Sequence, residues 1–177
     1  MEKLLKKEWL EELAARKEQV IAYRRHLHQH PELSFQEYET SQFIYDEMSK
    51  LENVEVTRPT ATSVLVKITG GKPGKKIGLR ADIDALPIQE QRDELDFKSV
   101  VDGKMHACGH DAHITWMLGV AKVMSTLKNE WKGTLILIAQ PAEELLTGAK
   151  AMVNDSMYYK GVPVPDYLFG MHTWSLP

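Results

Sequence analysis

The sequence lacks most of the features that mark secreted, membrane-spanning or nucleic-acid-binding proteins. It contains one cysteine, so no disulfide can form within the chain, which suits a reducing compartment. Lysine and arginine number 22 and aspartate and glutamate 25, so the net charge is −3 and no large basic surface is available for phosphate backbones. The opening stretch, MEKLLKKEWLEELAARKEQV, mixes charges among its apolar residues and predicts neither a signal peptide nor a membrane span. We therefore expect a cytoplasmic protein with no nucleic-acid or membrane partner.

What is present is an ordinary globular composition, 43% hydrophobic and 27% charged, in a chain of 177 residues that is long enough for one domain. No repeat, low-complexity tract or linker divides it.

Two helices are predicted at the N-terminal end. Apolar residues from Leu10 to Leu27 recur at roughly helical spacing, and Pro31 should end this helix. Ser34 and Glu37 have the spacing of a capping box, which predicts that a second helix begins there.

The rest of the chain alternates strands with helices. Two of the predicted strands, on either side of a glycine-rich turn, are expected to form a hairpin; they span Ser63 to Thr69 and Lys76 to Ile83. The other predicted strands are Val54 to Thr57, the continuously apolar Thr134 to Ala139, and Asp166 to His172. Helices are predicted from Ala112 to Leu127 and from about Glu143 to Val153. This order indicates an α/β fold with a mixed β-sheet flanked by helices.

Polar side chains stand at the ends of three predicted strands. Asp82 and Asp84 end one strand, Glu143 and Glu144 follow the next, and His172 ends the last. Because ligands in open α/β sheets bind outside the carboxyl ends of strands, we expect these groups to meet at one edge of the sheet.

The segment MHACGHDAH, from Met105 to His113, concentrates metal-ligand chemistry. Thiolate, imidazole and carboxylate are the usual protein ligands of zinc and related ions, and Cys108 and His110 can turn toward one ion from a glycine-containing loop. Asp111 is expected to be the N-cap of the following helix. Taken alone, the segment is equally compatible with a buried apolar Cys108 and hydrogen-bonded structural histidines.

The segment PAEE places Glu143 beside Glu144. Adjacent carboxylates repel each other unless a positive charge is near, and a metal would supply it, leaving one carboxylate free as a general base. The alternative is a helix N-terminus that favours acids through its dipole. His172 is a weak signal, since a lone histidine after an apolar run is more often structural.

Two further patterns have alternative explanations. His26 and His30 are four residues apart, as in two-histidine metal helices, but no glutamate follows the first, and helix packing with surface hydrogen bonds explains them as well. Asp82 and Asp84 could serve as the acid and base of a glycosidase, yet no aromatic residues that would stack on a sugar accompany them. Support of the metal ligands is the preferred hypothesis for this pair.

Five sequence blocks together resemble one family. RRHLHQHPELSFQE, GLRADIDALPIQE, MHACGHDAH, QPAEE and GMHTW occur in the order and at about the spacing found in M20 metallopeptidases. The resemblance is to the aminoacylase-like branch, which includes hippurate hydrolases, indole-3-acetyl-amino-acid hydrolases and N-acetyl-diaminopimelate deacetylases. It extends from about Tyr23 to Trp174, and five blocks in register are highly specific.

The resemblance implies a metal-dependent amidohydrolase that cleaves the amide bond of N-acyl amino acids or small dipeptides. It implies two divalent metal ions, zinc or alternatively manganese, cobalt or nickel, and Glu143 as the general base. The implied metal ligands are Cys108, His110, Glu144 and His172. The resemblance gives no ligand role to His106 or His113.

The chain departs from the family pattern in two ways. Leu145 to Gly148 replaces a glycine-rich stretch, and the chain ends near where the family begins a smaller lid and dimerisation domain, before a final histidine ligand. Residues 1–177 are thus expected to be the N-terminal part of the catalytic domain, without the lid.

The alternative is a truncated metal-binding remnant with a structural or partner-binding role, whose sheet edge is covered by another copy or another protein. A thiol redox role is disfavoured because no second cysteine exists to resolve an oxidised Cys108.

Overall fold

The computed structural model describes residues 6–154 and 162–174. The strands are β1 (Val54–Thr57), β2 (Val64–Thr69), β3 (Lys72–Asp82), β4 (Lys132–Gln140) and β5 (Tyr167–Gly170). The helices are α1 (Lys7–Ala15), α2 (Lys17–Gln29), α3 (Tyr38–Ser49), α4 (His110–Thr126) and α5 (Gly148–Asn154), with a short 3₁₀ turn at Lys128–Glu130. The predicted N-terminal helix is therefore two helices that meet at Arg16, and the second ends just before Pro31 as expected. None of the helices in these ranges has the length and apolarity needed to cross a membrane.

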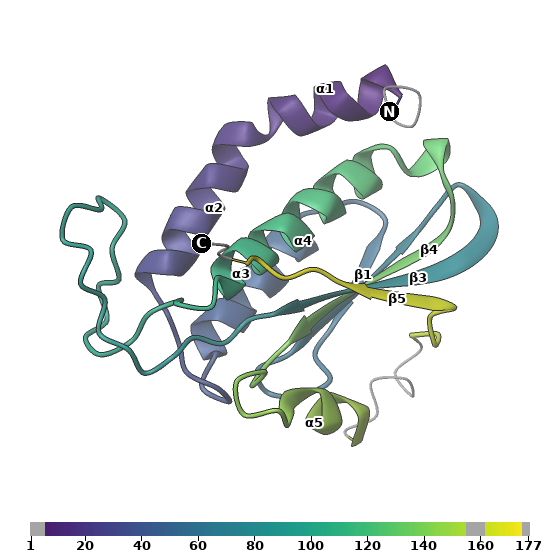
Figure 1. Ribbon diagram of the computed structural model, residues 1–177. Helices are drawn as coiled ribbons and strands as arrows, with labels where there is room; N and C mark the ends of the chain where they lie inside the picture. The colour runs from purple at the N-terminus through teal and green to yellow at the C-terminus, as the bar shows by residue number, and fades with distance from the viewer. Residues whose placement is uncertain (1–5, 155–161, 175–177) are drawn as a thin grey trace.

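The strands form one mixed sheet in the order β1-β2-β4-β3-β5 (Figure 1). β3, β4 and β5 run parallel, whereas β1 and β2 are antiparallel to their neighbours. The predicted α/β class with a mixed sheet is confirmed. The parallel half of the sheet brings the carboxyl ends of β3, β4 and β5 to the same edge.

The predicted hairpin between β2 and β3 is wrong, because β4 lies between these two strands. Leu137 of β4 pairs with Val66 of β2 on one side and with Leu79 of β3 on the other. β4 is almost entirely buried and apolar, and such a strand is most stable at the centre of a sheet with neighbours on both edges. β4 is far from β2 and β3 in the sequence, so the glycine-rich turn between those two strands gives no indication that β4 pairs with both.

Helices cover both faces of the sheet. Figure 1 shows α4 along one face and α5 on the opposite side. The larger core packs α2, α3 and α4 against one face, with fully buried Ile44, Met48, Leu118 and Leu137 among its members. A smaller core beneath α5 joins Met152 to Leu65 and Ile136. These two layers hold the carboxyl edge of the sheet in place.

The predicted capping box at the start of α3 does not form. The Ser34 hydroxyl donates to Asp84 at 2.6 Å, and the buried Glu37 carboxylate accepts the backbone N–H of Ala142 at 2.8 Å. Glu32 instead accepts the N–H of Thr40 at 2.8 Å in the first turn of α3. Ser34 and Glu37 therefore bind residues far away in the sequence and do not cap the helix as their spacing predicted.

The start of α4 also differs from the prediction. Gly109, in the left-handed region at φ +83°, precedes the helix, and Asp111 lies inside its first turn. Asp111 is fully buried and pairs with His28 at 2.7 Å and with Arg24 at 3.0 Å. Asp111 thus holds α2 against α4 and is not an N-cap.

The last predicted helix begins five residues late, at Gly148 rather than Glu143. The residues between form a tight turn in which Ala142 has φ +48°, and the N–H of Leu146 donates to the carbonyl of Glu143 at 2.7 Å. The first turn of α5 contains no acidic residue. The interpretation of Glu143 and Glu144 as acids at a helix N-terminus is therefore wrong.

Candidate metal centre

The predicted polar groups converge at the carboxyl edge of the parallel strands. Asp82 is the last residue of β3, Glu143 and Glu144 lie in the turn after β4, and His172 follows β5. The loop that carries Cys108 reaches the same edge as it enters α4 (Figure 1). The expectation that three strands deliver these groups to one place is confirmed.

Cys108, His110 and Glu144 form the first cluster. Their ligand-type atoms all lie within 4.8 Å of one another. His110 Nε2 and Glu144 Oε1 are buried, stand 3.9 Å apart, and have no hydrogen-bond partner in the described part of the chain. Buried polar atoms without partners cost free energy, and a thiol, an imidazole and a carboxylate are a donor set suited to zinc. The residues present therefore fit a divalent cation.

Asp84 sets the orientation of this cluster. Its carbonyl accepts a hydrogen bond from His110 Nδ1 at 2.8 Å, which leaves the Nε2 lone pair facing Cys108 and Glu144. Its carboxylate accepts the N–H of Glu144 at 3.0 Å. Burial opposes ionisation of Asp84, but hydrogen bonds from His110, Ser34 and the backbone outweigh it and lower its pKa to about 2. Asp84 is thus a buried anion that holds two candidate ligands.

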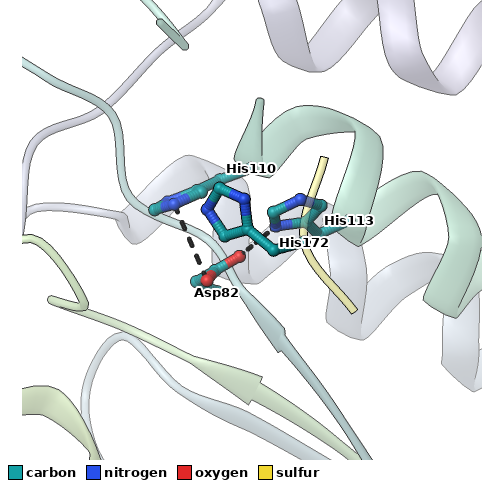
Figure 2. Close-up of side chains that lie close together, drawn as sticks. All are labelled: Asp82, His110, His113 and His172. Atoms are coloured by element: carbon teal, nitrogen blue, oxygen red, sulfur yellow. Dashed lines mark hydrogen bonds and ion pairs between the residues drawn. The ribbon is translucent and has the colours of Figure 1, made fainter. Parts of the chain in front are cut away.

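A second cluster contains Asp82, His110, His113 and His172, whose ligand-type atoms also lie within 4.8 Å of one another (Figure 2). Asp82 is fully buried, and its carboxylate accepts hydrogen bonds from His113 Nδ1 and, at 2.6 Å, from Arg80. Burial opposes its ionisation, but His113, His110 and Arg80 outweigh burial and lower its pKa. The His172 ring lies 4.7 Å from the His113 ring, centroid to centroid.

Glu143 and His172 complete the surroundings of the centre. The Glu143 side chain is 29% exposed, and its Oε2 lies 3.8 Å from His110 Nε2. His172 is exposed, with its Nε2 3.3 Å from Cys108 Sγ. Burial and the nearby Glu144 raise the pKa of the Cys108 thiol to about 11, so the free chain carries a protonated thiol at neutral pH. A divalent cation would favour the thiolate.

Two histidines whose roles the sequence left open behave differently from each other. His113 is buried and belongs to the second cluster, and its place one helical turn after His110 was the only sequence signal for this. His106 is buried with both ring nitrogens unpaired among the described residues, and burial lowers its pKa to about 4. It belongs to neither cluster.

His26 and His30 do not join the centre. Their rings lie 4.7 Å apart, and His30 Nδ1 contacts the carbonyl of His26 at 2.8 Å. They line a separate pocket with Phe43 and Lys104. Within residues 6–154 and 162–174 they belong to no group of three or more ligand-type side chains close enough to share an ion.

The fold and this site define a class: an α/β protein with a candidate metal centre at the carboxyl edge of its parallel strands. The chain belongs to peptidase family M20/M25/M40, whose sequence model matches residues 78–177. This match includes Asp82, His110 and the paired glutamates.

Known relatives agree with this family assignment. The chain is 45% identical over 159 residues to an N-acyl-L-amino acid amidohydrolase of Geobacillus stearothermophilus, covering 90% of this chain and 42% of that protein. It is 42% identical over 159 residues to an N-acetyldiaminopimelate deacetylase of Oenococcus oeni, covering 88% and 41%. Among solved structures, the YXEP protein of Bacillus subtilis, described as a dinuclear metal-binding peptidase of the M20 family, matches with a TM-score of 0.83 and 42% identity, covering 91% and 44%. The chain thus spans less than half the length of these relatives.

Proposed function

We propose that this chain supplies metal ligands and the general base of an amidohydrolase that cleaves the amide bond of N-acyl amino acids or small dipeptides. One observation carries the proposal: His110 Nε2 and Glu144 Oε1, which have no hydrogen-bond partner among the described residues, lie close to Cys108, with a second carboxylate, Glu143, beside them. The names of the Geobacillus and Oenococcus relatives support the substrate class.

Two divalent ions, zinc or alternatively manganese, cobalt or nickel, would be held by Cys108, His110, Glu144 and His172. The relative described as dinuclear supports the number two. When bound, such ions would polarise the scissile carbonyl and lower the pKa of the attacking water. The carboxylates that crowd this site in the metal-free chain are the charges that such ions would neutralise.

Glu143 is the proposed general base. Its carboxylate is partly exposed and reaches the same imidazole as Glu144, so it can face both the centre and a substrate that enters from solvent. It would take a proton from the attacking water and give that proton to the nitrogen of the leaving amine. Glu144, whose N–H is held by Asp84, is the better ligand because its position is fixed.

We further propose that residues 1–177 form the N-terminal part of the catalytic domain of a cytoplasmic enzyme, which acts as a homo-oligomer. The lid and the final histidine ligand would then lie outside this chain. The share of the relatives' length that the chain covers, 42% and 41% in the two enzymes above, supports the first point, that these residues are one part of a longer protein.

The metal-to-protein ratio of the purified chain tests the proposed site directly. Elemental analysis of the wild type should give a ratio approaching two, and His110→Ala should lose the metal. His30→Ala is the matched control, because this histidine lies outside both clusters and its loss should leave the ratio unchanged. A ratio near zero in both wild type and His110→Ala would mean that these four residues hold no metal in this chain on its own, and that the activity must be sought in the longer protein.

A metal-binding module without hydrolytic activity is the second candidate. It is favoured by β5, an outer strand whose Tyr167, Leu168 and Phe169 are all more than half exposed, as expected of an edge that another chain covers. A hydrolysis assay separates the two functions. Metal-dependent release of an amino acid from an N-acyl amino acid supports the enzyme, whereas bound metal without turnover supports the module.

A further inference from the structure

We propose that His113 is a positioning residue that holds His172 in the metal centre through a hydrogen bond to the backbone N–H of Thr173, and that it is not itself a metal ligand. The proposal rests on the proposed function in one respect, the assignment of His172 as a ligand. His113, His172 and Asp82 lie together in Figure 2.

The two ring nitrogens of His113 are both in use. Nδ1 lies against the Asp82 carboxylate, which can only accept, so Nδ1 carries the proton. Nε2 therefore has the lone pair, and it accepts the Thr173 N–H at 2.9 Å. A backbone N–H can only donate, which agrees with this tautomer. Because its one lone pair is occupied, His113 has none to offer a metal ion.

Asp82 is itself held from the sheet. One of its oxygens faces His113, and the other accepts a hydrogen bond from Arg80 at 2.6 Å. The Arg80 Nε donates to Gln140 of β4 at 2.9 Å. This chain of contacts runs from the centre of the sheet to His113 and makes the ring a fixed acceptor for the segment that carries His172.

That segment needs such a tether. The pairing of β5 with β3 ends at Gly170 opposite Arg80, two residues before His172. The Thr173 hydroxyl donates to the carbonyl of Cys108 at 3.2 Å, and a side chain at Gly109 would collide with this hydroxyl. Thr173 thus contacts the Cys108 loop through its hydroxyl and His113 through its N–H, while its neighbour His172 reaches Cys108 Sγ.

A double-mutant cycle on the full chain tests the positioning role. Zinc affinity, measured by competition with a chromophoric chelator, should fall about 10–100-fold in His113→Leu, the range seen when groups that orient ligands are lost. His113→Gln should recover most of it, because the amide supplies a donor toward Asp82 and an acceptor toward Thr173. In a His172→Ala background, His113→Leu should cause little further loss.

Equal losses in the two backgrounds would overturn the proposal. If His113→Gln then recovers affinity, His113 has a general structural role; if it does not, His113 is a ligand. If His113→Leu does not fold, Thr173→Pro removes the same N–H from the other side. Its loss of affinity beyond that of Thr173→Val, which lacks only the hydroxyl bonded to the Cys108 carbonyl, must show the same dependence on His172.

A second readout needs no metal. Amide hydrogen exchange of Thr173 in the metal-free chain should be slow in the wild type and in His113→Gln, and fast in His113→Leu. A Thr173 amide that stays protected in His113→Leu would overturn the tether. If the wild type binds no zinc, the proposed metal site does not assemble in this chain on its own, and the exchange pattern still decides whether His113 holds Thr173.

Discussion

The carboxylate of Asp84 accepts a hydrogen bond from the backbone N–H of Glu144 at 3.0 Å, and this contact ties the end of β3 to the turn after β4. The carbonyl of the same residue accepts from His110 Nδ1 at 2.8 Å. One buried aspartate therefore orients two proposed ligands from different elements. Its Ser34 partner joins the segment before α3 to the same point.

Asp84→Asn should weaken zinc binding by about 10–100-fold, because the amide removes the buried charge. Its NH2 group must also face other donors, either the Glu144 N–H and the Ser34 hydroxyl at one oxygen position or His110 Nδ1 at the other. A chelator competition assay measures the change. Asp46→Asn, an exposed aspartate on α3, is the matched control and should bind zinc like the wild type. Unchanged affinity in Asp84→Asn would show that Asp84 does not orient the ligands.

Glu143→Gln should retain its metal and reduce amide hydrolysis by about 10²–10⁴-fold in the longer protein, since it removes only the group that carries the proton. Glu144→Gln should lose metal. Elemental analysis and an assay for released amino acid check both variants. If Glu143→Gln loses its metal as well, the roles of the two glutamates must be exchanged.

Cys108→Ala should weaken metal binding and change its dependence on pH. The pKa of the free thiol is raised to about 11 by burial and by Glu144, so the metal must displace a proton from Cys108 near neutral pH. Affinity should therefore rise with pH in the wild type, and the variant should release about one proton fewer. Calorimetric titration in two buffers of different ionisation enthalpy counts the protons. Equal counts and equal affinities would mean that Cys108 is a buried filler.

The ionic network between α2, α3 and α4 supports the fold on the side of the sheet that carries His110. Glu47 accepts hydrogen bonds from Tyr23 and, at 3.3 Å, from Lys122, whose side chain is also buried. Burial opposes ionisation of Glu47, but Lys50, Tyr23 and Lys122 outweigh it, so its pKa is lowered. Removal of the charge would leave Lys122 without its partner anion.

Glu47→Gln should lower the free energy of unfolding by about 3 kcal/mol at pH 7, the low end for a broken buried pair because the amide keeps some hydrogen bonds. Since the folded pKa of Glu47 is lowered, its contribution is present above the unfolded pKa of about 4.3 and is lost as pH falls through the folded value. Urea unfolding should show wild type and variant converging at acid pH. Glu55→Gln, an exposed glutamate, should change stability little at either pH. A difference that persists unchanged at acid pH would contradict an electrostatic origin.

Residue types and local periodicity determined much of this protein. The apolar run of β4, the helical period of α4 and the polar groups after three strands predicted an α/β fold with one functional edge, because each depends on neighbours close in the chain. The blocks around Cys108, Glu143 and His172 likewise indicated the family, since they carry the chemistry in their own residues.

Only the tertiary structure decided the remaining features, because each depends on a partner far away in the sequence. β4 separates β2 from β3, since strand order follows from burial of the whole sheet. Ser34 hydrogen-bonds Asp84, 50 residues away, and leaves α3 to be capped by Glu32. Asp82 fixes the tautomer of His113, and the N–H of Thr173, 60 residues away, donates to the lone pair that this tautomer leaves. Sequence spacing places a histidine on a helix, but the contacts of the folded chain decide what each of its ring nitrogens binds.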